Sequence, residues 1–251
     1  SVQEVLQQRL SQLLGAPIEL TGAGRTDAGV HARLMVAHFN YAVPSQREGF
    51  PEIKTANSLL THSHGQATYG EWISFRLARM LPPDIAVSKV VPVCPTAHAR
   101  FDALSRTYRY YISHRHDPFM RHYTCFMHQQ LDYNRMNEAC RQLFRYTDFT
   151  SFSKLHTDVK TNNCTISEAH WTPCGEREWV FTIRANRFLR NMVRAIVGTL
   201  VDVGLGKLSV SGFCRIIEGK DRCRAGMSMP GHALFLEEIC YPDRLFLHER
   251  H

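Results

Sequence analysis

The stretch Ser105-Arg106-Thr107-Tyr108-Arg109-Tyr110-Tyr111-Ile112-Ser113 carries the clearest strand pattern in the chain. One face would hold Tyr108, Tyr110 and Ile112, and the other Thr107, Arg109 and Tyr111. This two-residue period is that of a β-strand with one face in a core. The stretch therefore predicts a strand over residues 105–113, with further elements on both sides of it.

Segments before and after this strand supply the remaining elements. Strand-like stretches occur at residues 18–23, 34–41, 85–93, 178–184 and 233–240. Apolar residues recur at helical spacing over residues 2–14, 71–80, 136–144, 188–203 and 209–218. Hairpins and helices follow one another without a strict β-α-β alternation. We therefore expect an α+β fold with helices packed on a largely antiparallel sheet.

The first helix has a clear beginning and end. Ser1 and Glu4 have the spacing of a capping box, and Gly15 followed by Pro17 ends the apolar repeat. We expect a docked amphipathic helix rather than a transit peptide. In contrast, residues 44–70 are polar and show no period, which predicts a long surface loop or an insertion.

Composition limits the class of protein. The 251 residues are 44% hydrophobic and 21% charged, which fits a soluble globular protein and excludes a disordered or fibrous chain. The longest apolar run, residues 192–206, is interrupted by Arg194 and Asp202, so we expect no membrane span. A net charge of +7 indicates an anionic partner, nucleic acid first and an acidic membrane second.

Cysteine and histidine side chains are the usual metal ligands in such a chain. The eight cysteines include no Cys-x-x-Cys pair, and we expect them to be reduced. Ligand-type side chains do gather between residues 114 and 128, namely His114, His116, His122, Cys125 and His128. Their polar surroundings favour a loop or a strand end, so we expect no metal. A metal-dependent enzyme built on this segment is the alternative.

The glycine-rich stretch from Gly22 to Ala32 is a candidate site. It begins like a dinucleotide-binding loop, but Asp27 stands at the third glycine position, where its charge would face a pyrophosphate. The small residues around Asp27 let a ligand approach closely, and Arg25 can hold the carboxylate ionised by a charge-assisted hydrogen bond. A second glycine pair, Gly204 and Gly206, lacks P-loop spacing and predicts a helix end.

Arginines recur near aromatic residues. Arg187, Arg190 and Arg194 follow at i, i+3 and i+7, which predicts one face of the apolar helix 188–203. An arginine on so apolar a helix needs an anionic partner. The basic side chains around Tyr108 are Arg100, Arg106 and Arg109. Together with the aromatic rings they could hold and stack RNA bases.

The sequence resembles a known family. Residues 24–32, Gly-Arg-Thr-Asp-Ala-Gly-Val-His-Ala, are similar to the signature of the TruA family of tRNA pseudouridine synthases. Supporting similarities run through nearly the whole chain, at residues 1–4, 81–87, 98–101, 106–110, 148–152, 191–198 and 233–236. The resemblance implies an α+β enzyme of the pseudouridine-synthase type, with two similar halves around a central, mainly antiparallel sheet, flanking helices and a basic cleft.

The family implies a reaction and its setting. Its members isomerise uridines 38 to 40 in the anticodon stem-loop of tRNA, as homodimers without cofactor or metal. For this chain we accordingly expect a cytoplasmic tRNA-modifying isomerase, with residues 1–100 and 101–251 as the two halves of the catalytic domain. A catalytically inactive RNA-binding protein of the same fold is the alternative.

The matching motifs assign roles to individual residues. Asp27 corresponds to the family's catalytic aspartate, which would attack C1′ or assist removal of the 2′ proton. Tyr108 corresponds to the active-site tyrosine, which stacks on the flipped base and takes part in removing the C5 proton. Arg194 corresponds to the pocket arginine that pairs with the aspartate.

Further residues are expected to bind the substrate. Leu234 corresponds to an apolar residue lining the base pocket, and Arg25 is expected to help extrude and hold the nucleotide. Arg100 and Arg106, which lie in matching motifs, are expected to bind RNA. The chain departs from the family pattern in three places. The sequence starts at the first helix, whereas the family pattern has a strand and a Tyr-Asp-Gly loop before it. Residues 45–70 are longer than usual, and Ala78 replaces an asparagine.

Overall fold

The computed structural model describes residues 1–41, 68–154 and 161–247. The chain forms two compact units. The first consists of residues 1–23, 36–102 and 242–251, and the second of residues 24–35 and 103–241. The chain therefore crosses from one unit to the other four times, and the short segment 24–35 is separated in sequence from the rest of its unit. Most of the polar stretch 44–70 lies outside the described residues.

The first unit is built around two helices, α1 (Val2–Leu14) and α3 (Tyr69–Ala78). The predicted capping box of α1 is confirmed, because Glu4 N donates to Ser1 Oγ and Gly15 ends the helix with φ 62°. Two short strands, β1 (Thr21–Gly22) and β3 (Ala37–His38), pair antiparallel. The core of this unit consists of Leu10, Leu14, Ile18, Leu20, Ile73 and Leu77.

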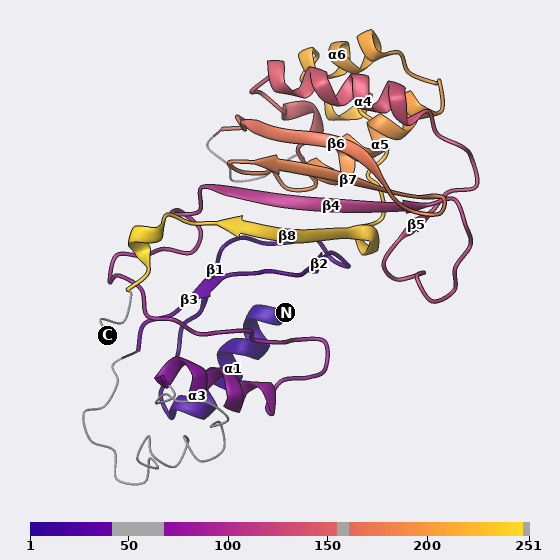
Figure 1. The fold of residues 1–251 in the computed structure, drawn as a ribbon. Helices are drawn as coiled ribbons and strands as arrows, with labels where there is room; N and C mark the ends of the chain where they lie inside the picture. The colour runs from indigo at the N-terminus through magenta and orange to yellow at the C-terminus, as the bar shows by residue number, and fades with distance from the viewer. Residues whose placement is uncertain (42–67, 155–160, 248–251) are drawn as a thin grey trace. The chain divides into compact units, whose positions relative to one another are not determined.

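The second unit contains a six-stranded sheet (Figure 1). Its strands are β2 (His31–Ala32), β4 (Ser105–Ser113), β5 (Cys125–Phe126), β6 (Ile166–Gly175), β7 (Glu178–Ala185) and β8 (Leu234–Cys240). The order is β2-β8-β4-β7-β6, with β5 beside β4. Neighbours run antiparallel except for β2 with β8 and β4 with β5.

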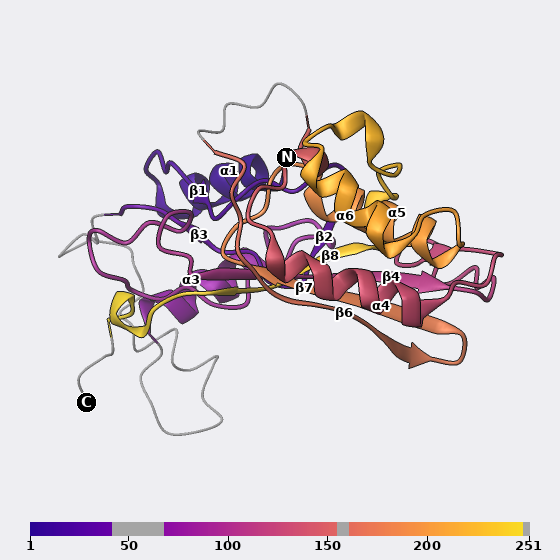
Figure 2. The ribbon, with the colours of Figure 1, turned by 90° about the horizontal axis from the view of Figure 1, so that it is seen from above.

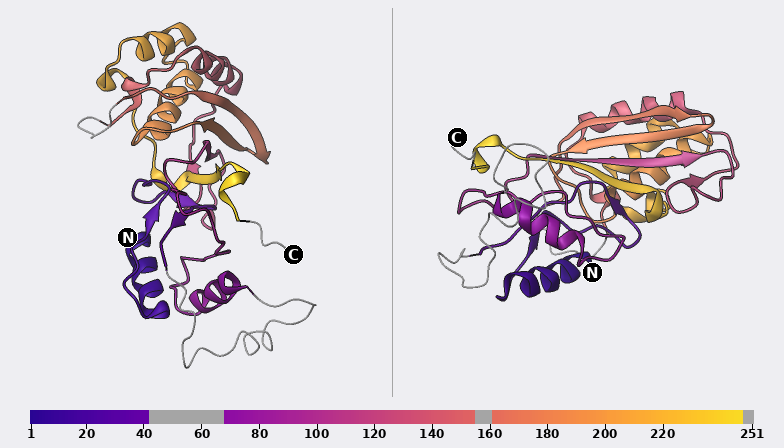
Figure 3. Two further views of the ribbon diagram at one scale, coloured as in Figure 1. Left: turned by 90° about the vertical axis from the view of Figure 1, so that its left-hand side faces the viewer. Right: turned by 60° about the horizontal axis from the view of Figure 1, so that its bottom comes forward.

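Three helices cover one face of this sheet, α4 (Tyr133–Gln142), α5 (Met192–Gly204) and α6 (Val210–Glu218) (Figure 2). Figure 3 shows the long strands β8, β4, β7 and β6 side by side, with the helices on the far side in its right-hand view. The mixed sheet and its helices confirm the expected α+β class. The strand over 105–113 is confirmed at its predicted ends.

Alternation along β4 separates the two faces of the sheet. Tyr110 and Ile112 are fully buried with the helices, and Tyr108 packs partly buried against the same core. Thr107 and Arg109 therefore point to the other face. A register shift between Thr107 and Tyr108, opposite β8, adds one residue to β8 at this point. Such a bulge re-aims side chains locally.

Several predicted boundaries were wrong. The predicted strand over 85–93 is absent except for an isolated bridge at Val93, and the strands over 18–23 and 34–41 shorten to β1 and β3. β6 was not predicted, because Pro173 and polar residues interrupt its apolar alternation. The helix predicted over 188–203 begins only at Met192, because Asn191 has a left-handed backbone with φ 68°.

The end of α5 lies where the sequence predicts a helix end. The Gly204 region ends α5, and Gly206 has φ 72°, as expected for a helix end. All eight cysteines lie within the described residues, and none forms a disulfide. In the described part of the chain, no helix is long and apolar enough to cross a membrane.

Candidate active site

Asp27 is held by two arginines of the second unit. Arg194 Nη1 donates to Asp27 Oδ2 at 3.0 Å, and Arg190 Nε lies 3.8 Å from Asp27 Oδ1. The side chains of Asp27 and Arg194 are only 19% and 22% exposed, whereas Arg190 is 61% exposed. The pair with Arg194 is therefore the shielded and stronger one, and Arg190 adds a weak, solvent-screened contact.

The loop that carries Asp27 is fixed on both sides. Val30 N donates to Asp27 O at 3.1 Å, which closes a turn, and Gly29 has φ 79°. A Cβ at Gly231 would lie 2.7 Å from Ala28 O, so the segment before β8 packs directly on this turn. β2 then follows and pairs parallel with β8 through His31 and Phe235. The loop that carries Asp27 is thus held against the start of β8.

Arg194 is held by a reciprocal contact with Met229. Its Nε donates to Met229 O at 2.6 Å, and Met229 N donates to Arg194 O at 3.1 Å. One edge of the guanidinium is fixed by a carbonyl while Nη1 reaches the carboxylate. A planar guanidinium can make both bonds at once, and a lysine ammonium cannot reproduce this fork.

Arg190 reaches Asp27 by a route that the sequence did not predict. We expected Arg187, Arg190 and Arg194 on one helical face, but α5 begins at Met192, so Arg187 and Arg190 precede the helix. Asn191, which has a left-handed backbone, stands between the two arginines that contact Asp27. The helical-face prediction was wrong, although Arg190 and Arg194 do meet at the same carboxylate.

Arg25 does not hold Asp27 as the sequence suggested. Arg25 is exposed. The ion pairs of Asp27 within the described residues are with Arg190 and Arg194, and Arg25 forms none with it. The carboxylate instead uses arginines more than 150 residues away, the contact with Arg194 spanning 167 positions. Arg25 is an exposed residue two positions before Asp27.

Tyr108 lies on β4, on the sheet face that packs against the helices. Its ring meets Phe188 edge to face with centroids 5.1 Å apart. Burial raises the pKa of Tyr108 to about 12, with the negative charge of Asp27 adding to the rise and Arg106 opposing it. The phenol is therefore protonated at neutral pH and lies within electrostatic reach of Asp27.

The other residues expected to bind substrate differ in burial and in the unit to which they belong. Leu234 on β8 is 5% exposed and pairs with Tyr110 of β4. Arg106 donates from Nη1 to Ala103 O and to Asn186 O, at 3.1 and 2.8 Å. Arg100 is exposed in the first unit, with its guanidinium 5.8 Å from the Phe101 ring centroid. The structure thus brings Asp27, Arg194, Tyr108 and Leu234 into one unit, and Arg100 belongs to the other.

The histidine-rich segment 114–128 makes ordinary structural contacts. His114 Nδ1 lies 2.9 Å from Met127 O, and its Nε2 lies 2.8 Å from Tyr133 Oη. Within the described residues, no three histidine, cysteine or acidic side chains come together as metal ligands. The metal-dependent alternative therefore has no ligand set in this part of the chain.

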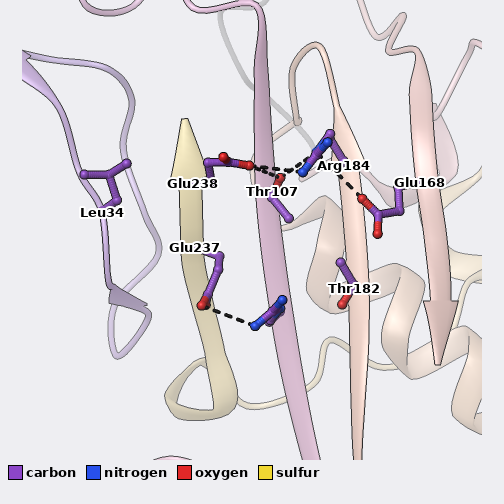
Figure 4. A pocket seen from close by; sticks show the side chains of 8 residues that line it. Leu34, Thr107, Glu168, Thr182, Arg184, Glu237 and Glu238 are labelled. Atoms are coloured by element: carbon purple, nitrogen blue, oxygen red, sulfur yellow. Dashed lines mark hydrogen bonds and ion pairs between the residues drawn. The ribbon is translucent and has the colours of Figure 1, made fainter. Parts of the chain in front are cut away.

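A separate polar hollow of about 470 Å³ lies on the sheet face away from Tyr108 (Figure 4). Arg184 on β7 donates to Glu238 at 3.1 Å and to Thr107 at 2.9 Å, and lies 3.7 Å from Glu168. Glu237 contacts Arg109 at 3.5 Å. Three glutamates and two arginines line this hollow, and Asp27 and Tyr108 are not among the lining residues.

Comparison with known proteins identifies the family. A family model described as tRNA pseudouridine synthase matches residues 139–242. A protein from Parabacteroides distasonis named tRNA pseudouridine synthase A is 53% identical over 246 residues, covering 98% of this chain and 88% of the relative. The chain belongs to the tRNA pseudouridine synthase A family. A Bacteroides thetaiotaomicron relative of the same name is 53% identical, covering 99% of this chain and 85% of the relative.

A relative of lower sequence identity carries the same name. A Bacillus subtilis protein named tRNA pseudouridine synthase A is 35% identical, covering 97% of this chain and 90% of the relative. Two residues beside the site were not predicted from the sequence, namely Asn191 and Met229. Met229 acts through its backbone, so no side-chain signal marks it, and Asn191 is recognisable only by its backbone conformation.

Proposed function

We propose that this protein is a tRNA pseudouridine synthase that isomerises uridine in the anticodon stem-loop, at positions 38 to 40. The observation that carries the proposal is the Asp27 carboxylate, held by Arg194 at 3.0 Å in a loop that begins the family's signature. Membership of the tRNA pseudouridine synthase A family supports the enzyme over the inactive RNA-binding alternative.

The reaction rearranges one nucleotide without adding an atom from outside. The bond between N1 and C1′ breaks, the base turns, and a bond forms between C5 and C1′. C5 loses a proton to the surroundings and N1 gains one, so the product has the composition of the substrate. Such a sequence requires a nucleophile or base at the sugar, a proton acceptor at C5 and a pocket that holds the detached base. We propose no cofactor or metal.

Asp27 is the group at the sugar in this proposal. An ionised carboxylate can attack C1′ to form a covalent sugar ester, or it can assist removal of the 2′ proton. Both routes need a carboxylate that is fixed in direction, and the hydrogen bond from Arg194 fixes it. Arg194 is thus proposed to orient the reacting group.

Tyr108 is proposed to stack on the flipped base and to take part in removing the C5 proton. Its pKa of about 12 means that the phenol is protonated at neutral pH. It can accept the C5 proton only as its own proton leaves, so we propose that it relays a proton. Leu234, buried on the neighbouring strand, is proposed to line the pocket for the base.

Basic residues are proposed to bind the RNA. Arg25 is exposed beside Asp27, which suits a side chain that holds an extruded nucleotide. Arg100 and Arg106 carry charge on either side of the unit boundary at residue 102, and the net charge of +7 favours a polyanion. Most of the affinity for tRNA would come from phosphate contacts of this kind.

The setting of the enzyme is also a proposal. We propose that it works in the cytoplasm as a homodimer, and that residues 1–100 and 101–251 form the two halves of its catalytic domain. Sedimentation of the purified chain with and without tRNA tests the dimer, because a monomer at micromolar concentration would contradict it.

Release of tritium from tRNA containing [5-³H]uridine tests the activity directly, since C5 loses its hydrogen only when pseudouridine forms. Base-resolution mapping of the product then identifies the modified positions. We expect release from tRNA with uridine at positions 38 to 40 and none after these are changed to cytidine. Binding of tRNA without tritium release would support the inactive alternative instead.

A further inference from the structure

Asn191 lies at a backbone position that most residues avoid. Its φ of 68° and ψ of 0° are left-handed, and it stands directly between Arg190 and the helix that carries Arg194. Asparagine tolerates this conformation better than other residues with a side chain. Asn191 is the N-cap residue of α5, and its side chain makes no capping hydrogen bond. That side chain is used for something else.

The Asn191 amide reaches across to Ser228. Asn191 Nδ2 donates to Ser228 Oγ at 2.6 Å, and Arg222 Nη2 donates to the same oxygen at 2.7 Å. A hydroxyl oxygen has two acceptor positions, and these two donors use both. Arg222 Nη1 also donates to Gly226 O at 3.2 Å. Ser228 is therefore fixed from two directions.

Ser228 immediately precedes Met229, whose carbonyl holds Arg194. The segment 225–230 lies directly on α5, because Gly226 N donates to Thr199 Oγ1 at 2.9 Å and a Cβ at Gly198 would lie 1.8 Å from Met227 O. The bridge from Asn191 to Ser228 thus joins the residue after Arg190 to the residue before the Met229 carbonyl. Arg190 directly precedes the Asn191 end of this bridge. The Met229 carbonyl, which accepts from Arg194, directly follows the Ser228 end.

We infer that Asn191, Ser228 and Arg222 form a positioning network that sets the direction in which Arg194 and Arg190 present themselves to Asp27. None of the three touches the carboxylate. They act through the Met229 carbonyl and through the backbone turn at Asn191, and the inference rests on the proposed function of Asp27. Groups behind a reacting residue commonly fix its orientation in this way.

Ser228→Ala is the first test, because it removes the shared acceptor and leaves the backbone unchanged. We expect kcat for tRNA to fall about tenfold while KM stays within about twofold, since a misdirected Arg194 impairs the chemical step more than RNA binding. Ser228→Thr keeps the hydroxyl and should restore kcat. The control Ser211→Ala, at an exposed position of α6, should behave as the parent. Unchanged kcat in Ser228→Ala, or a rise in KM alone, would overturn the inference.

Two variants at Asn191 separate the side chain from the backbone. Asn191→Gly retains the left-handed turn and loses the hydrogen bond, whereas Asn191→Ala also strains the turn. We expect Asn191→Gly to lower kcat as Ser228→Ala does, and the double variant to lower it no further, because both remove one bridge. Asn191→Ala should lower kcat more than Asn191→Gly. Multiplicative losses in the double variant would contradict a shared bridge.

A measurement that does not depend on enzyme activity distinguishes failure of the positioning network from failure of the proposed function. Hydrogen exchange at arginine Nε–H groups can be followed by NMR in the full chain, with the Arg194 signal identified by its loss in Arg194→Lys. We expect that signal to be protected in the parent and to exchange at least about threefold faster in Ser228→Ala. Equal exchange would overturn the positioning network. Absence of tritium release from the parent chain would instead overturn the proposed function.

Discussion

Arg194 and Asp27 form a hydrogen-bonded ion pair of 3.0 Å that joins the start of α5 to the loop before β2. Both side chains are about four-fifths shielded from solvent, and the arginine is held from behind by the Met229 carbonyl at 2.6 Å. The contact therefore serves two purposes, since it orients the carboxylate and links two distant segments of one unit.

Replacing Arg194 should affect stability and turnover together. We expect Arg194→Met to unfold more readily than the parent, because it leaves the Asp27 carboxylate without its shielded partner. Arg194→Lys should retain part of the stability and little of the turnover, since an ammonium cannot contact Met229 O and Asp27 at once. Urea unfolding and single-turnover rates measure the two effects.

A double-mutant cycle with Asp27→Asn measures the contact itself. We expect a coupling of about 1 to 2 kcal/mol, between the values typical of exposed and of buried pairs. A coupling below about 0.5 kcal/mol would show that the two side chains do not interact in solution.

Asp27→Asn should abolish tritium release and change the Kd for tRNA by no more than a few-fold, because phosphate contacts supply most of the affinity. Filter binding and tritium release on the same preparation provide the comparison. Asp102→Asn, at a carboxylate of the other unit that accepts from His98 N, is the matched control and should retain turnover. Measurable turnover by Asp27→Asn would refute the catalytic assignment.

Tyr108→Phe should keep the aromatic ring against Phe188 and lose the proton relay. We expect turnover to fall at least about 100-fold with little change in Kd, as is typical when a general acid–base group is removed. Tyr111→Phe serves as control, because Tyr111 lies on the same strand with its ring against Phe235 on the opposite face. Near-normal turnover in Tyr108→Phe would leave the residue only a stacking role.

Alkaline pH should destabilise the second unit through Cys164. Burial raises the pKa of this 1%-exposed thiol to about 11, from an ordinary value of 9.0. The folded state therefore favours the neutral thiol, so this stabilisation is complete below pH 9 and is lost as the pH rises through 11. The loss amounts to about 2 to 3 kcal/mol.

Urea unfolding between pH 8 and pH 11 checks this prediction. Cys164→Ala should lose about 2 to 3 kcal/mol less over that range than the parent, whatever its stability at pH 8. Cys223→Ala, at an exposed thiol, should follow the parent. Parallel curves for the parent and Cys164→Ala would contradict the assignment.

Gly198→Ala should be strongly destabilising, although alanine favours helices. The added Cβ would lie 1.8 Å from Met227 O and 2.9 Å from Met227 C, and backbone atoms cannot easily move aside. We expect a loss of about 2 kcal/mol or more in the free energy of unfolding. Gly24→Ala, where nothing lies within 4 Å, should be nearly neutral. Equal stability of both variants would indicate that segment 225–230 does not pack on α5.

The sequence predicted most of what local patterning controls. The β4 alternation, the α1 caps and the apolar helix α5 follow from residue periods and end signals, and the structure confirms them. The pairing of Asp27 with Arg194 followed from the resemblance and from the need of an arginine on an apolar helix for an anion.

What the sequence did not predict depends on contacts distant in the chain. Asn191 interrupts a helical pattern with a left-handed backbone, and its amide donates to Ser228, 37 positions away. A periodicity window cannot detect such a contact. β2 has two residues and exists only because β8 lies beside it. Proximity in sequence predicts Arg25 as the partner of Asp27, but the shielded partner is Arg194, on the distant helix α5.

The segment 24–35 belongs to the second unit, although the chain on both sides of it belongs to the first. During synthesis Asp27 leaves the ribosome early, whereas Arg194, Met229 and β8 follow near the end. The Asp27 loop can therefore acquire its contacts with Arg194 and β8 only when most of the chain has been synthesised, so this part of the second unit closes late in folding.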